Sequence, residues 1–172
     1  EKVYISNSVT SIGNSAFSGC QSLKTIRLPH NITYIADGLF ENCSNLVSVY
    51  IPEKVTSIRE HAFLGCSSLS SITIPRSVRF LSVGVFVNCS SLDTITCYAT
   101  TPPETSTQYN NTFNGMNGTF ASLDCSRILL YVRKSVMVDY KAEEQWKPFM
   151  IRPIEGYTVT FKNWDKQTLL TV

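Results

Sequence analysis

The chain has 172 residues, of which 43% are apolar and only 16% charged, and its formal net charge is +2. This length fits one or two domains with a substantial core. The Lys and Arg residues are scattered, which argues against nucleic-acid binding, because that function needs clustered positive charge. No apolar run approaches the roughly 18 residues of a membrane span, so we expect no membrane insertion by this stretch.

The first element, the stretch from Val9 to Pro29, returns three more times at a constant spacing of 23 residues. A repeat of this length predicts a solenoid, in which each coil stacks on the next. We therefore expect the recurring apolar residues to form continuous core columns. The phenylalanine column is Phe17, Phe40, Phe63 and Phe86, and the cysteine column is Cys20, Cys43, Cys66 and Cys89.

Each repeat begins with a Val-x-x-Ile segment such as Val55 to Ile58, whose three-residue spacing predicts a turning segment rather than an alternating strand. A short Ala-Phe element follows, which is too short for an independent helix. We expect it to form a single helical or 3₁₀ turn that places the ring in the core. The position before each cysteine holds only Gly or Asn, which predicts a left-handed backbone there.

Each repeat ends in a short strand such as Thr25 to Leu28, usually closed by a proline. These strands are expected to stack in parallel about 4.8 Å apart. The first of them starts the chain, since Val3 and Ile5 lie 23 residues before Ile26 and Leu28. No signal peptide is present, so we interpret the chain as a fragment or processed form.

The four column cysteines should have parallel Cβ vectors in stacked coils, a geometry that disfavours disulfides. We predict four reduced, buried thiols that pack as small apolar groups. Cys97 and Cys125 lie outside this column, and their pairing with each other stays open.

The 23-residue register ends near residue 98, and residues 99–132 are predicted to form an irregular coil. Its strand, Ile128 to Val132, lies 35 residues after the strand around Ile95. A capping helix is predicted over residues 135–149, with Ser135 as the N-cap. Val138, Ala142 and Trp146, together with Phe149, would form its apolar face and cover the open end of the stack.

The repeat consensus, clearest from Ile51 to Ile72, resembles the BspA-like leucine-rich repeat. The resemblance implies one solenoid domain over residues 1–154 and a cell-surface or secreted protein that attaches to host proteins or other cells, as in Bacteroides-type bacteria. Residues 155–172 are expected to be a linker and the start of a second β-module. Their sequence YTVTFKNWDKQTLL resembles the opening of a Listeria–Bacteroides repeat, and its expected strands are Tyr157 to Phe161 and Thr168 to Val172.

Residues that could support catalysis are few. His30 and His61 occupy different repeat positions and belong to no catalytic or zinc motif. The cysteine spacing does not suit zinc either. We therefore expect no enzyme activity, no metal and no cofactor.

The outward positions of the strands offer the best candidate site. If Ile26 points inward, its neighbours along the strand point outward. The expected partner-binding residues are Tyr4, Lys24, Arg27, Tyr50 and Thr73. Tyr and Arg are enriched at binding hot spots, although a plain solvated face is the alternative. The sequence thus predicts a module that recognises a host or bacterial surface protein. A structural spacer and a carbohydrate-binding module that uses Tyr4 and Tyr50 are the alternatives.

Overall fold

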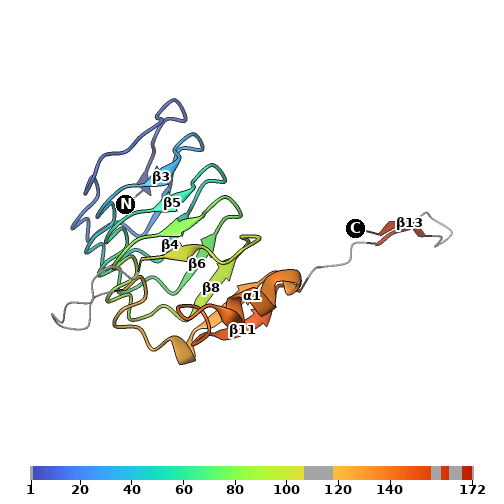
Figure 1. Cartoon of the computed structure of the whole chain (residues 1–172). Coiled ribbons are helices and arrows are strands. Elements are labelled where there is room, and N and C mark those ends of the chain that lie inside the picture. The colour runs from blue at the N-terminus through green and yellow to red at the C-terminus, as the bar shows by residue number, and fades with distance from the viewer. Residues whose placement is uncertain (1, 107–117, 156–159, 163–167, 172) are drawn as a thin grey trace.

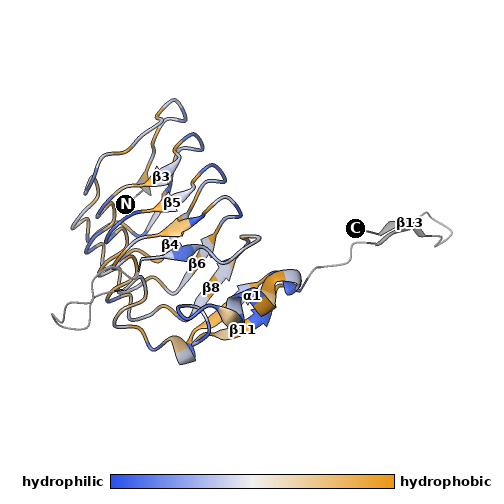
Figure 2. Ribbon diagram, in the orientation of Figure 1, coloured by the Kyte–Doolittle hydropathy of each residue, from blue (hydrophilic) through white to orange (hydrophobic). Residues whose placement is uncertain are grey.

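The computed structural model of the chain describes residues 2–106, 118–155, 160–162 and 168–171. Its coils stack side by side with their strands parallel (Figure 1), which confirms the predicted leucine-rich-repeat type of solenoid. Figure 2 shows hydrophobic residues along the stacked coils and hydrophilic residues in the loops that project from one edge. No helix in the described part of the chain has the length and apolarity to cross a membrane.

The repeat-ending strands form the first face of the solenoid. It consists of two parallel sheets, in the orders β1-β2-β4 and β6-β8-β10-β11. Within the 23-residue repeats the register pairs Ile26 with Val49 and Ile72 with Ile95. The strands are β1 (Lys2–Val3), β2 (Thr25–Arg27), β4 (Ser48–Tyr50), β6 (Ser71–Ile74), β8 (Thr94–Cys97), β10 (Leu129–Val132) and β11 (Met150–Pro153).

The expected 35-residue shift is found where β10 joins the sheet, because Ile95 pairs with Leu130. The parallel pairing therefore continues from β8 to β10 in spite of the longer spacing in the sequence. β11 then pairs in parallel with β10 and extends the sheet by one strand, which the sequence pattern did not predict.

Three of the four Val-x-x-Ile segments supply strands of a second parallel sheet, so the expectation that they only turn was wrong for these three, whereas Val9 to Ile12 forms no strand. Their inward residues, such as Ile35 and Ile58, are fully buried, while Tyr34 and Ser57 beside them are partly exposed. Two residues per coil are too few to show an alternation of apolar and polar residues in the sequence. The strands form because the backbones of neighbouring coils pair with each other. The strands are β3 (Tyr34–Ile35), β5 (Ser57–Ile58), β7 (Phe80–Leu81) and β9 (Glu104–Thr105).

The segments that carry the phenylalanines form successive turns, each closed by a hydrogen bond from an amide to the carbonyl three residues earlier, as in the 3₁₀ turn that was expected. In the second coil, the Leu39 amide donates to the Ala36 carbonyl and the Cys43 amide to the Phe40 carbonyl. The predicted left-handed position is confirmed, with φ of 58° at Asn42 and 73° at Gly65. The column of His61 is also left-handed, with φ between 55° and 65° at Ser15, Gly38, His61 and Gly84. These repeated bends keep every coil congruent with the next.

The phenylalanine column forms one stacked row. The ring centroids of Phe40 and Phe63 are 5.5 Å apart, and those of Phe63 and Phe86 are 5.8 Å apart. Phe120 adds a fifth ring, 5.9 Å from Phe86. Its coil carries the same left-handed turn two residues later, at Ser122 with φ 68°. Phe120 was missed in the sequence because it follows Phe86 by 34 residues instead of 23.

The cysteine column donates its thiols along the stack. The Sγ atoms of Cys43, Cys66 and Cys89 each donate to a phenylalanine carbonyl of the preceding coil, at 2.9, 3.1 and 3.1 Å. Burial raises the pKa of Cys43 to about 11 and that of Cys89 to about 12, and it also raises the pKa of Cys66. Each thiol therefore keeps the proton that its hydrogen bond requires.

The burial predicted for Cys20 was wrong. Cys20 is exposed, because no described coil stacks on the outer side of its turn. The open question of a Cys97–Cys125 pair is answered too, since both are free. Cys97 is buried, with its Sγ 3.1 Å from the Tyr140 hydroxyl.

We expect a thiol reagent at pH 8 to modify Cys20 rapidly in the native chain, and Cys43, Cys66, Cys89 and Cys97 only after unfolding. The reason is that thiolates react, whereas these four thiols are buried and hold their protons. Titration before and after denaturation without a reductant measures both groups. Fewer than six reactive thiols in the denatured chain would contradict the model of free cysteines.

The capping segment contains a much shorter helix than the predicted residues 135–149. The helix α1 spans Met137–Ala142, preceded by the 3₁₀ turns η1 (Cys125–Arg127) and η2 (Lys134–Val136). The backbone of Glu143 is extended, at φ −80° and ψ 125°, and ends the helix. Ser135 makes no cap, because it lies inside η2.

The apolar face predicted for this helix was wrong for Val138 and Ala142, which are exposed, whereas Trp146 and Phe149 are buried as expected. Val138 is 76% exposed, whereas Tyr140 is fully buried. The chain turns after Glu143, and Trp146 and Phe149 then pack edge-on against Phe120, with ring centroids 4.9 Å away in both cases. Burial of these aromatic rings outweighs the weak tendency of so short a segment to continue as a helix.

The C-terminal residues contain two described strands, β12 (Thr160–Lys162) and β13 (Thr168–Thr171), which pair antiparallel. They lie within the two strands expected there, Tyr157 to Phe161 and Thr168 to Val172, apart from Lys162. Residues 157–159 and 172 of those predictions lie outside the described residues.

Candidate binding surface

The most exposed aromatic side chains of the first face lie at its N-terminal end. Tyr4 is 89% exposed and Tyr50 is 52% exposed. The register pairs Arg27 directly with Tyr50 on the adjacent strand, and the Arg27 guanidinium carbon lies 5.9 Å from the Tyr50 ring centroid. Tyr4 directly follows Val3, the register partner of Ile26, so it continues the column one coil further. We call Tyr4, Arg27 and Tyr50 the Tyr–Arg face.

The remaining two predicted site residues lie beside this face. Lys24 is exposed and precedes β2, and its carbonyl accepts a hydrogen bond from the Val47 amide at 2.8 Å. Thr73 is exposed on β6, where it pairs with Thr96. Because β4 and β6 belong to different sheets, Thr73 is not a register partner of Tyr50. The structure thus brings Arg27 and Tyr50 together most directly.

Two further residues of the same column escaped the sequence analysis. Thr96 pairs with Tyr131, and Tyr131 pairs with Arg152 on β11. The column therefore ends as it begins, with a tyrosine beside an arginine. Tyr131 could have been found from the 35-residue shift of β10, whereas no sequence signal predicted β11.

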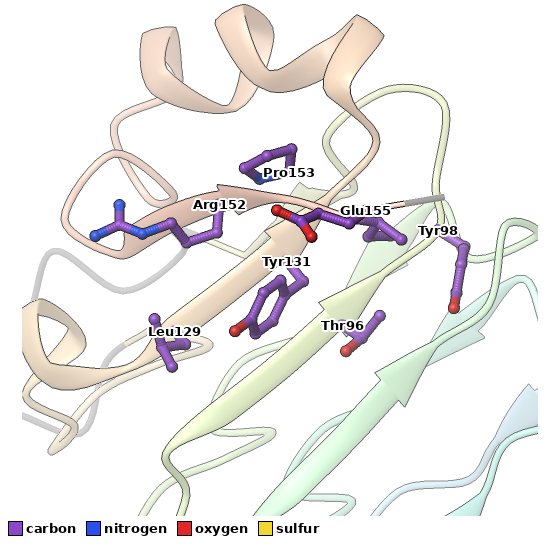
Figure 3. Close-up of a pocket in the computed structure, with 8 residues that line it drawn as sticks. Thr96, Tyr98, Leu129, Tyr131, Arg152, Pro153 and Glu155 are labelled. Atoms are coloured by element: carbon purple, nitrogen blue, oxygen red, sulfur yellow. The ribbon is translucent and has the colours of Figure 1, made fainter. Parts of the chain in front are cut away.

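A hollow of about 550 Å³ lies at this C-terminal end of the first face (Figure 3). It is formed by residues of β8, β10 and β11 and of the segments that follow β8 and β11. We call it the C-terminal hollow, and its lining residues are Thr96, Tyr98, Leu129, Tyr131, Arg152, Pro153, Ile154 and Glu155.

The sheet formed by β3, β5, β7 and β9 carries another pair of an arginine and a tyrosine. The Arg59 guanidinium carbon lies 3.8 Å from the Tyr34 ring centroid, which is a cation–π contact. His61 lies at the turn beside Glu60, with Nδ1 and Oε1 3.8 Å apart, and His30 is exposed. Among the described residues, no group of three or more His, Cys, Asp or Glu side chains could hold a metal ion.

Parallel strands stacked at a constant repeat, with apolar columns inside and a polar outer face, define a solenoid of the leucine-rich-repeat class. The family profile described as "BspA type Leucine rich repeat region" matches residues 1–119 in six copies. The chain therefore belongs to the BspA-type leucine-rich repeat family.

Two solved structures are similar to this chain over most of its length. The leucine-rich repeat protein of Treponema pallidum is 25% identical, with a TM-score of 0.56 over 84% of this chain and 64% of that one. A leucine-rich cell surface protein of Faecalibacterium prausnitzii is 29% identical, with a TM-score of 0.55 over 74% of this chain and 40% of that one. The chain thus spans less than two thirds of either relative. No curated protein sequence matches it.

Proposed function

We propose that this chain is a non-enzymatic recognition module that binds a host or bacterial surface protein through its Tyr–Arg face. The family supports a repeat module for protein interaction, and one similar structure is described as a cell surface protein. An extracellular or cell-surface location is part of this proposal.

The observation that carries the proposal is the contact of Arg27 with the half-exposed ring of Tyr50. The guanidinium lies within the roughly 6 Å over which a cation and an aromatic ring attract each other, and this attraction favours a preorganised surface for a partner. Tyr4 adds a nearly fully exposed ring one coil away. Tyrosine and arginine are the side chains that most often dominate protein interfaces.

The double variant Arg27→Ala with Tyr50→Ala should reduce binding of the labelled chain to its target cells by about tenfold or more, since both hot-spot side chains are lost. Binding is measured on cultured epithelial cells and on bacteria, before and after protease treatment of their surfaces. Protease-sensitive binding identifies the partner as a protein.

The matched control is Arg76→Ala with Phe80→Ala, which removes the same kinds of side chain from the region of the second sheet. It should leave binding unchanged. Equal binding by both double variants, at an unchanged melting temperature, would contradict the proposal and favour a structural spacer.

A further inference from the structure

The C-terminal hollow is a second candidate site, separated from the Tyr–Arg face. The Tyr–Arg face lies on and beside β1, β2 and β4, whereas the hollow lies over β8, β10 and β11 at the other end of the stack (Figure 1). Its volume of about 550 Å³ lies within the range of small-molecule sites, which is about 300–1,000 Å³. The hollow is therefore large enough to hold a small ligand. The Tyr–Arg face, by contrast, consists of side chains that project from a sheet.

Two tyrosine rings and several hydrogen-bonding groups form the walls of the hollow. Figure 3 shows the Tyr131 and Tyr98 side chains on either side of Thr96, with Glu155 and Pro153 across from them. Tyr98 is 40% exposed and Tyr131 is half-buried, so both rings remain partly accessible. A tyrosine offers an apolar ring face for stacking together with a hydroxyl that donates and accepts.

The charged groups of the hollow cancel each other. Arg152 and Glu155 are the charged residues among those described in its lining, and neither forms an ion pair with another described residue. One Nη atom of Arg152 donates to the Ile151 carbonyl at 3.1 Å, which leaves other guanidinium donors for a ligand. The Glu155 carboxylate supplies acceptors only.

These features together describe the ligand. It should have an apolar face to stack on tyrosine, several groups that both donate and accept hydrogen bonds, and no net charge. A sugar ring meets all three conditions, with its C–H face and its ring of hydroxyls. We propose that the C-terminal hollow binds a neutral saccharide, with Tyr98 and Tyr131 against the ring and Arg152 and Glu155 on its hydroxyls.

The proposal is tested by applying the whole chain to an array of neutral and acidic glycans and measuring Kd for the bound glycans by calorimetry. We expect binding to neutral glycans. Tyr98→Ala and Glu155→Gln should each raise Kd by about tenfold, through loss of a stacked ring or a charged hydrogen-bond acceptor. Tyr98→Phe, which keeps the ring, should raise Kd less than Tyr98→Ala.

The control is Tyr50→Ala, which should leave glycan binding unchanged because Tyr50 lies outside the hollow. The same variant alters the Tyr–Arg face, so failure of the saccharide proposal is distinguishable from failure of the proposed function. The saccharide proposal is overturned if no neutral glycan binds, if only acidic glycans bind, or if Tyr98→Ala and Glu155→Gln both bind like the wild type at an unchanged melting temperature.

Discussion

The substitution Phe63→Ala should lower the free energy of unfolding by about 3–5 kcal/mol, the usual loss for a buried phenylalanine. Phe63 is fully buried in the middle of the stacked row, with Phe40 on one side and Phe86 on the other. Removing its ring leaves a cavity between two coils, neither of which can bury its apolar face alone. The midpoint of chemical denaturation measures the loss.

Phe17→Ala provides a matched control within the same column. Phe17 is only partly buried, and among the described rings it stacks on Phe40 alone, at 5.7 Å. Its loss should therefore cost roughly half as much as that of Phe63, because fewer contacts disappear. Ser71→Ala, at an exposed site on β6, should change stability by about 0.5 kcal/mol or less. A denaturation midpoint that Phe63→Ala leaves unchanged would contradict the packing of coil on coil.

The repeat made the first face and the core columns predictable from sequence, because a constant spacing converts positions along the chain into neighbours in space. The facing pair Arg27 and Tyr50 follows from that conversion alone. The second sheet was not predictable, since two-residue strands such as Ser57–Ile58 show no periodicity of their own. Their backbone pairing exists only because the coils are stacked.

Prediction failed most clearly at the two ends of the stack. Cys20 shares the sequence column of three buried thiols, but no coil covers it among the described residues, and it is exposed. Burial in this column therefore depends on a neighbouring coil and not on the sequence of the repeat itself. Beyond residue 98, the insertion hid the repeat of Phe120. Helical spacing then suggested that Val138 is buried. The aromatic rings of Trp146 and Phe149 cover the end of the stack instead, and Val138 is exposed. The C-terminal hollow was not predicted because no sequence signal indicated β11, which supplies Arg152 and Pro153 to its lining.

Trp146→Ala should lower the free energy of unfolding by about 3–5 kcal/mol, although Trp146 lies outside the repeats. The side chain is 1% exposed, and its ring centroid lies 4.9 Å from that of Phe120 and 5.3 Å from that of Tyr140. It closes the end of the phenylalanine row, so its loss exposes that end to water. Chemical denaturation, followed by far-ultraviolet circular dichroism, measures the change.

Val138→Ala is the control that separates cap packing from helix formation. Val138 belongs to α1 but is 76% exposed, so its substitution should change stability by about 0.5 kcal/mol or less. A helical cap with Val138 and Trp146 on one buried face would instead make both substitutions costly. Similar losses for the two variants would therefore contradict the observed cap.

Trp146→Phe tests what the indole nitrogen contributes to the cap. The Nε1 atom of Trp146 donates to the Pro103 carbonyl at 3.1 Å, a contact that ties the cap to the segment after β8. Phenylalanine keeps an aromatic ring against Phe120 but leaves that buried carbonyl without its donor, which costs about 1–3 kcal/mol. The loss for Trp146→Phe should therefore be smaller than the loss for Trp146→Ala. Equal losses would mean that the hydrogen bond, rather than ring packing, holds the cap on the stack.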